Sequence, residues 1–271
     1  MATLFLVHAH PDDEAIATGG VMMRAHAEGH RVVLVTCTRG EEGEIYNMDE
    51  AASRPRLAQI RTEELRRAGE ILGVDRQEFL GYRDSGMAGE PSNQGPGSFH
   101  TAPLAEAAER LAALLREERP EVVVTYTPDG TYGHPDHVKA YQTTVAALDL
   151  VAGEGWRPAR LYLHAIPRSL IEELGRRFAE SEEFREFTES GRSLPILGVP
   201  DEEITTVVDV RDLAERKREA FAAHVSQNNP KNPIVTMAGQ IFEAAFGQEC
   251  FVLARGELTS ERPERSLLSG L

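Results

Sequence analysis

The chain alternates short apolar runs with longer amphipathic segments, and this alternation limits the possible folds most strongly. The apolar runs have the length of strands and lie at 3–7, 31–37, 78–82, 121–127, 160–166, 204–210 and 250–254. Segments with helical periodicity lie between them, at 13–28, 56–73, 103–120, 135–151, 168–187, 211–227 and near 236–246. Such alternation is typical of parallel strands covered by helices on both faces. We therefore predict a Rossmann-like α/β fold with a mostly parallel sheet.

The length of 271 residues is compatible with one large domain. We expect a single α/β domain over residues 1–255, in which residues 1–150 carry the motifs and residues 151–255 form the C-terminal part. The segment 256–271 is polar, so we expect a flexible tail.

Charge and cysteine content restrict the partners and the compartment. The chain has 29 Lys and Arg against 44 Asp and Glu, a net charge of −15 that repels nucleic acid and anionic lipid. We expect a small-molecule partner, with neither nucleic acid nor membrane, and the sequence leaves a homo-oligomer open. Cys37 and Cys250 lie in apolar runs, which favours buried free thiols. With no signal-peptide pattern and no apolar run of membrane-spanning length, these features indicate a cytoplasmic protein.

Four loops follow predicted strands, at 8–14, 38–55, 82–102 and 127–137. Ligands of open α/β sheets bind outside the carboxyl ends of the strands, so we expect these loops to form one site there. Gly19 and Gly20 lie inside the predicted 13–28 helix and lack the G-x-G-x-x-G spacing, so we expect no nucleotide site.

Two of these loops carry the residues of a metal centre. The stretch "HAHPDDE" contains His10 and Asp13, and "GTYGHPDH" contains His134 and His137. Two histidines and one carboxylate are a recurring ligand set of catalytic zinc, with one position left open for water. His10, Asp13 and His137 can therefore hold one zinc ion, although Fe²⁺, Mn²⁺ and Co²⁺ also accept such donors.

The neighbouring groups suit hydrolysis. Asp12 is free to accept a proton from water, and His134 or Tyr132 can reach an oxyanion. An alternative is that Asp12, Asp13 and Asp136 only complement helix N-termini. Two separate H-P-D motifs, each directly after an apolar strand, favour the metal centre over capping. His8 lies nearer the core, and we interpret it as structural or as a partner of a ligand.

These motifs resemble a known family. "HAHPDDE" and "GHPDH" are similar to the LmbE-like (PIG-L) family of zinc-dependent N-acetylglucosamine deacetylases. "VVLVTCTRGEEGE", "QIRTEEL" and "GYRDSGM" resemble its mycothiol-pathway branch, and "KREAFAAHVSQ" is a weaker similarity. The resemblance implies that His10, Asp13 and His137 bind zinc and that Asp12 is the general base.

The same resemblance implies roles for five further residues. His134 would stabilise charge or protonate the leaving amine, and Tyr132 would assist at the oxyanion. Arg61 and Asp84 would bind sugar hydroxyls, and Met87 would line the acyl or sugar pocket. From the residue patterns alone, Arg61 would be a solvated helix residue and Met87 would fill a gap in the core.

The acidic loop after the second strand allows two interpretations. Glu44 could contact the aglycone, or it could bind a second cation together with Glu41 and Glu42. We do not favour the second cation, because such a loop is commonly only solvated and mobile.

The sequence thus predicts a metal-dependent hydrolase that removes the N-acetyl group from an N-acetylglucosaminyl conjugate, such as GlcNAc-inositol or GlcNAc-malate. A thiol-conjugate amidase of the same family is the alternative. A non-catalytic Rossmann-like binding module is the third and least favoured hypothesis.

Overall fold

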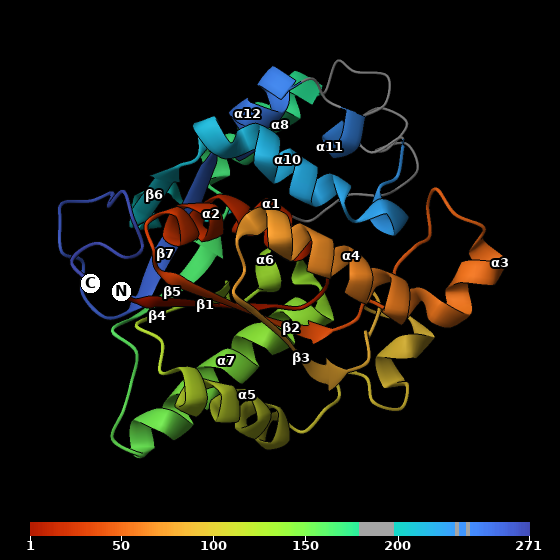
Figure 1. The fold of residues 1–271 in the computed structure, drawn as a ribbon, viewed down its shortest axis with the longest axis horizontal. Helices are drawn as coiled ribbons and strands as arrows, with labels where there is room; N and C mark the ends of the chain where they lie inside the picture. Colours follow the sequence, from red (N-terminus) through yellow and green to blue (C-terminus); the bar gives the residue numbers. More distant parts are fainter. Residues whose placement is uncertain (179–197, 231–232, 237–238) are drawn as a thin grey trace.

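The computed structural model describes residues 1–178, 198–230, 233–236 and 239–271 (Figure 1). Its strands form a single sheet in the order β3-β2-β1-β4-β5-β7-β6. Their bounds are β1 Thr3–His8, β2 Arg31–Thr38, β3 Arg76–Tyr82, β4 Val122–Tyr126, β5 Arg160–Ala165, β6 Thr206–Asp209 and β7 Gln248–Arg255. Neighbouring strands are parallel from β3 through β2, β1 and β4 to β5, while β7 is antiparallel to both β5 and β6. The predicted mostly parallel sheet is confirmed.

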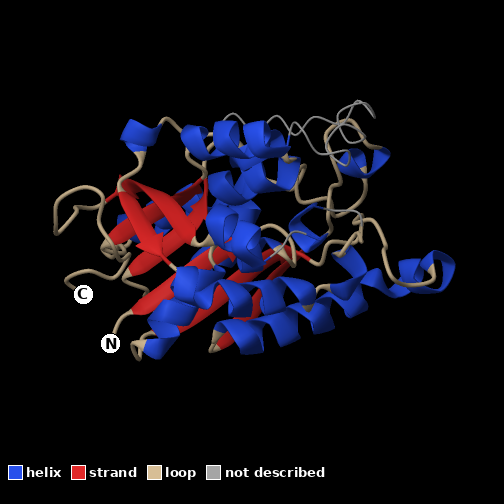
Figure 2. Ribbon diagram, turned by 90° about the horizontal axis from the view of Figure 1, so that it is seen from above, coloured by secondary structure: helices blue, strands red, loops and turns tan. Residues whose placement is uncertain are grey.

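Helices cover both faces of this sheet (Figures 1 and 2). The α-helices in the motif-bearing part are α1 Asp13–Ala17, α2 Gly19–Ala27, α3 Glu50–Ser53, α4 Leu57–Leu72, α5 Leu104–Glu118, α6 Gly130–Gly133 and α7 Pro135–Gly153. Those that follow are α8 Arg168–Phe178, α10 Ala214–Ala222, α11 Pro233–Thr236 and α12 Gly239–Phe246. Short 3₁₀ helices are η1 Arg54–Arg56, η2 Pro91–Gln94, η3 Asp201–Glu203, η4 Arg211–Leu213 and η5 Val225–Gln227. The part of the predicted 168–187 helix beyond residue 178 falls outside the described residues.

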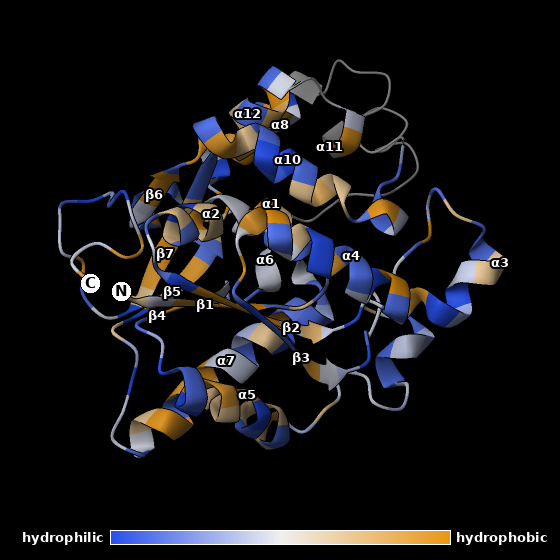
Figure 3. Cartoon of the chain, viewed as in Figure 1, coloured by the Kyte–Doolittle hydropathy of each residue, from blue (hydrophilic) through white to orange (hydrophobic). Residues whose placement is uncertain are grey.

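The strand β1 shows how the two hydrophobic cores form. Successive side chains of a strand point to opposite faces, so Phe5 and Val7 pack in the core beneath α5 and α7. Leu4 and Leu6 point the other way, into the core beneath α2, α4 and α10. Figure 3 shows the apolar residues on the central strands and mixed polar and apolar residues on the covering helices. Burial of both faces explains why the strands read as continuous apolar runs.

The predicted 13–28 helix is in fact two helices that meet at Thr18. Thr18 has φ −143°, outside the helical range, and its hydroxyl lies 2.8 Å from Nε2 of His8. The second helix begins at Gly19 and Gly20, so the prediction that these glycines lie inside one helix is wrong. Its N-terminal amides donate to the Glu249 carboxylate, from Gly20 at 2.7 Å. A protein carboxylate thus occupies the anion position, consistent with the expectation of no nucleotide site.

The polar tail does not behave as the sequence suggested. We expected residues 256–271 to fray, but Leu267 and Leu268 are buried against the α2 side of the sheet. The guanidinium of Arg160 donates to the backbone carbonyls of Leu267 at 3.0 Å and Ser269 at 2.7 Å. Glu264, also fully buried, pairs with the edge strand β6. The hydrogen bonds of Arg160, together with the buried leucines and Glu264, thus hold in place a segment whose composition is typical of a free tail.

None of the helices described has the length and apolarity needed to cross a bilayer. Cys37 and Cys250 both lie among the described residues and are free and buried, as expected.

The packing of the tail is testable by truncating its leucines. Replacing Leu267 or Leu268 with Ala removes buried methyl groups and should lower the free energy of unfolding by about 2–5 kcal/mol. Leu271→Ala is the matched control, because Leu271 is 43% exposed and its loss should cost less than about 0.5 kcal/mol. Urea denaturation measures all three, and equal stability of the three variants would contradict the packed tail.

Candidate active site

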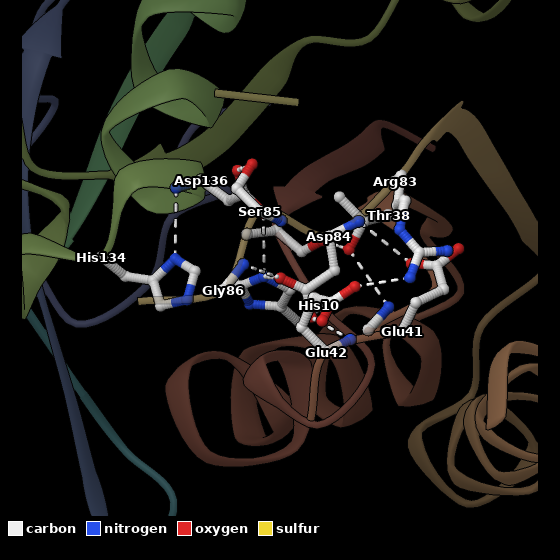
Figure 4. A network of polar contacts seen from close by, with 12 residues as sticks. His10, Thr38, Glu41, Glu42, Arg83, Asp84, Ser85, Gly86, His134 and Asp136 are labelled. Atoms are coloured by element: carbon white, nitrogen blue, oxygen red, sulfur yellow. Dashed lines mark hydrogen bonds and ion pairs between the residues drawn. The ribbon is translucent and has the colours of Figure 1, made fainter. Parts of the chain in front are cut away.

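The loops that follow four parallel strands meet at one edge of the sheet. His10, after β1, has its Nε2 3.4 Å from Oδ1 of Asp84, after β3, and 3.3 Å from Oδ2 of Asp136, after β4. The loop after β2 joins them through Gly40, whose carbonyl accepts a hydrogen bond from Arg61 at 2.8 Å. Figure 4 shows this junction. The predicted convergence at the carboxyl ends of the strands is confirmed.

Histidines and carboxylates cluster at this junction with the spacing of metal ligands. Two groups of three each place their ligand atoms within 4.8 Å of one another, and both contain His10. The members are His10, His134 and His137 in one group, and His10, Asp84 and Asp136 in the other. Asp13 lies between two of the imidazoles, with Oδ1 3.4 Å from His137 Nε2 and Oδ2 3.6 Å from His10 Nδ1.

The hydrogen bonds at the far side of each ring decide which nitrogen carries a proton. His10 turns Nε2 toward the carboxylates of Asp84 and Asp136, which only accept, so Nε2 carries a proton and Nδ1 is the nitrogen that faces Asp13. Against the effect of burial, the carboxylates of Asp84, Asp13 and Asp136 raise the pKa of His10 well above its usual value. His137 turns Nδ1 toward the carbonyl of Gly130 at 3.2 Å, so its proton is on Nδ1 and Nε2 is free. Nδ1 of His10 and Nε2 of His137 face the two oxygens of Asp13, at 3.6 and 3.4 Å. His10, Asp13 and His137 are not one of the two groups of three above.

His134 differs from these two histidines. It is the N-cap of α7, and its Nδ1 accepts a hydrogen bond from the backbone amide of Asp136 at 3.1 Å. Burial, followed by the charges of His10 and His137, lowers the pKa of His134 to about 2. The ring is therefore neutral with its proton on Nε2, which makes it a hydrogen-bond donor toward the site.

Asp13 is held as an anion. Its Oδ2 accepts from the backbone amide of His10 at 2.9 Å and from the hydroxyl of Tyr126 at 2.6 Å. Burial alone would raise the pKa of Asp13, but the charges of His137 and His10 lower it well below its usual value. The Tyr126 hydroxyl also lies 3.3 Å from Nδ1 of His8, which is fully buried on the core side of Asp13.

Asp12 stands beside the cluster in an uncommon backbone conformation. Its φ is +115°, and its carboxylate makes no capping hydrogen bond to α1, so the capping interpretation does not hold for Asp12. Nη2 of Arg61 lies 3.1 Å from its Oδ2 and also donates to the carbonyl of Pro11. Burial raises the pKa of Asp12 to about 6, against the opposing charge of Arg61.

Arg61 is 3% exposed and lies on α4, so its interpretation as a solvated helix residue is wrong. It reaches the site because Gly40 has no side chain. A Cβ at Gly40 would lie 2.0 Å from Nη1 of Arg61, and the φ of +67° there also favours glycine.

Asp136 is a functional residue that the sequence did not reveal. It was expected only in the first turn of the helix, and it does lie there, but its side chain is fully buried. Its Oδ2 accepts from the amide of Ser85 at 2.9 Å, and its Oδ1 accepts from the Ser85 hydroxyl. The doubled H-P-D motif indicated a metal centre, but it did not reveal the contact of Asp136 with Ser85, 51 residues earlier.

Asp84 connects three loops. Its amide donates to Glu41 at 3.0 Å, and its Oδ2 accepts from the amide of Glu42 at 3.2 Å (Figure 4). Glu42 also pairs with Arg83. Burial would raise the pKa of Asp84, but the charge of His10 lowers it below its usual range. Glu41 and Glu42 thus bind protein groups, and neither belongs to the possible ligand groups of the described residues, which gives no support to a second cation there.

The remaining predicted residues lie around the cluster. Tyr132 has its hydroxyl 3.5 Å from Nε2 of His137, and burial raises its pKa. Met87 is 43% exposed in the loop after β3, so it is not a core gap-filler. Glu44 is exposed, its carboxylate accepts from Tyr46, and it does not join the His and Asp cluster.

Comparison with known proteins places the chain in a family. The family model "GlcNAc-PI de-N-acetylase" (PIG-L) matches residues 5–148, which is more than half of the chain. The chain belongs to the PIG-L family. A relative from Thermomonospora curvata, named 1D-myo-inositol 2-acetamido-2-deoxy-alpha-D-glucopyranoside deacetylase, is 43% identical, with 99% of this chain and 96% of the relative covered. A relative of the same name from Streptomyces avermitilis is 41% identical over 99% of this chain and 97% of its own.

Solved structures agree with this PIG-L assignment at the level of the fold. The N,N'-diacetylchitobiose deacetylase of Pyrococcus horikoshii aligns with a TM-score of 0.62 at 21% identity, over 93% of this chain and 83% of that one. At such identity the likeness concerns the arrangement of strands and helices. The sheet that carries the candidate site therefore has the same overall arrangement as the sheet of that structure.

The buried carboxylate of Asp136 generates a prediction about ion affinity. Asp136→Asn replaces the acceptor that holds the proton on Nε2 of His10, and we expect zinc to bind about 10–100-fold more weakly. Competition with a chelating dye measures the affinity. Asp149→Asn, an exposed change on the same helix, should leave the affinity unchanged. Equal affinity in both variants would show that Asp136 does not orient His10.

Proposed function

We propose that this PIG-L protein hydrolyses the N-acetyl group of an N-acetylglucosaminyl conjugate, with GlcNAc-inositol as the first substrate to test. The observation that carries the proposal is the near full-length similarity to relatives that are named as deacetylases of that conjugate. The placement of Nδ1 of His10 and Nε2 of His137 beside the carboxylate of Asp13 supports it further. These supports favour deacetylation over thiol-conjugate cleavage and over a non-catalytic binding role.

We assign the metal ligands to Nδ1 of His10, the carboxylate of Asp13 and Nε2 of His137. The donor chemistry fits zinc, because two neutral imidazoles and one carboxylate are a common catalytic set. We leave His134 out of the ligand set because its Nε2 carries a proton. We leave out Asp84 and Asp136 because they lie behind His10, at its Nε2. The same donors accept Fe²⁺, Mn²⁺ or Co²⁺, so availability of the ion matters as well.

A divalent cation at these ligands supplies Lewis acidity, which lowers the pKa of water and polarises a carbonyl. Asp12 accepts the proton of the attacking water, since its carboxylate lies beside the ligand Asp13 and makes no cap to α1. His134 donates from Nε2 to the developing oxyanion, and the hydroxyl of Tyr132 assists there. Asp12 then returns its proton to the amine as the C–N bond breaks, which releases acetate.

Substrate recognition falls to the loops around this centre. The contact of Arg61 and Asp84 with sugar hydroxyls stays a prediction from the family resemblance, because both side chains are buried here and bonded to protein groups. Exposed Met87 would line the sugar side, and exposed Glu44 would meet the aglycone. The exposure of both side chains leaves them accessible to a ligand.

Separate variants of the base and of a ligand test the mechanism. Asp12→Ala should keep about one zinc per chain and lose at least about 100-fold in acetate release, because only the proton acceptor is removed. His137→Ala should lose both the zinc and the activity. Elemental analysis and an acetate assay with GlcNAc-inositol measure the two properties. Full activity of Asp12→Ala would contradict its assignment as the base.

The wild-type assay also decides between substrates. Acetate release from GlcNAc-inositol in preference to GlcNAc-malate is the expected result. Zinc binding together with cleavage of a bulky thiol conjugate, and no acetate release, would favour the amidase. A folded wild type that binds no zinc and gains no activity from added zinc would contradict the proposal as a whole.

A further inference from the structure

The strained backbone at Asp12 needs support from its surroundings. A residue other than glycine at φ +115° is in a strained conformation, which persists only where neighbouring groups hold it. The amide of Asp12 donates to Oε2 of Glu14 at 2.8 Å. This bond fixes the direction of the peptide that carries the proposed base.

Glu14 is itself held from a distant part of the chain. Its side chain is fully buried, and its second oxygen, Oε1, lies 2.7 Å from Nε2 of His224. His224 is also fully buried and follows the C-terminal end of α10, 210 residues further along the chain. A carboxylate can only accept, so Nε2 of His224 donates. Both oxygens of Glu14 are therefore engaged, one by His224 and one by Asp12.

The segment with His224 is anchored to α4. The amide and the hydroxyl of Ser226 both donate to the buried carboxylate of Glu64, each at 2.7 Å. Glu64 lies one turn after Arg61, which contacts Asp12 from the other side. The proposed base thus lies between two supports that start from the same helix.

We propose that His224 and Glu14 are positioning residues, which hold the amide of Asp12 and thereby aim its carboxylate at the attacking water. This inference rests on the proposed role of Asp12 as the general base. Neither residue contacts the substrate, and their contribution is geometric. The C-terminal part of the chain would then be required for turnover although the proposed metal ligands all lie before residue 138.

Replacement of the donor tests this role. His224→Phe keeps a ring but cannot donate to Glu14, and His224→Asn keeps a polar group that is shorter. We expect both to lower kcat for acetate release by about 10–100-fold, since misplacement of a reacting group is that costly. KM and zinc affinity should stay within about 2-fold. His224→Gln, whose amide can still donate to Glu14, should recover most of the loss.

A matched control separates positioning from stability. Lys217 and Glu249 form another fully buried ion pair between α10 and the start of β7, 2.7 Å apart, and none of their hydrogen bonds is to Asp12 or Glu14. Lys217→Met should lower the free energy of unfolding yet leave kcat of the folded enzyme unchanged. Equal loss of kcat in Lys217→Met and His224→Phe would overturn the positioning role.

A readout that needs neither substrate nor metal keeps the two proposals distinguishable. Hydrogen exchange at the Asp12 amide should become at least about 10-fold faster in His224→Phe or His224→Asn than in the wild type or Lys217→Met. Unchanged exchange, or full kcat in both His224 variants, would overturn the inference while the deacetylase proposal stands. A wild type without acetate release would contradict the deacetylase proposal, and the amide would still report whether His224 fixes Asp12.

Discussion

The position of the proton on each imidazole is the constraint on which the site depends. Carboxylates behind His10 and a carbonyl behind His137 each accept from one nitrogen of the ring, and the other nitrogen faces Asp13. A backbone amide behind His134 has the opposite effect and makes that ring a donor. Three similar side chains thus differ in their hydrogen bonding, which is set by the groups behind each ring.

These outer groups depend in turn on the order of the strands. Because β1 lies between β2 and β4, the loop after β1 meets loops from both sides. Asp136 and Asp84 can therefore reach the same nitrogen of His10 although they lie 52 residues apart in the sequence (136 − 84 = 52). The parallel sheet brings the ligands together, and the buried hydrogen bonds orient them.

The sequence predicted the parts of this arrangement that depend on short spacing. His10, Asp13 and His137 were predicted as ligands because they lie at two H-P-D motifs in loops that follow apolar strands. The burial of Arg61 was not predicted, because it depends on the approach of its guanidinium to Gly40, 21 residues earlier in the chain. The pairing of Glu14 with His224 was not predicted either, because these residues are 210 positions apart in the chain.

Contacts between residues far apart in the sequence also explain the errors in the predicted fold. The break at Thr18 comes from a hydrogen bond to His8 and from docking of the next helix on Glu249, neither of which is visible in a helical pattern. The tail looked free because its polar composition hides two leucines that pack on the core. Local periodicity specifies elements, whereas their ends depend on partners far away in the sequence.

The central claim is the identity of the nitrogens that hold the ion. A crystal structure of the zinc-loaded protein, with anomalous scattering recorded at the zinc edge, tests it most directly. We predict one zinc ion bound by Nδ1 of His10, the Asp13 carboxylate and Nε2 of His137, with His134 uncoordinated. Zinc bound by His134, or held by His10 together with Asp84 and Asp136, would contradict it.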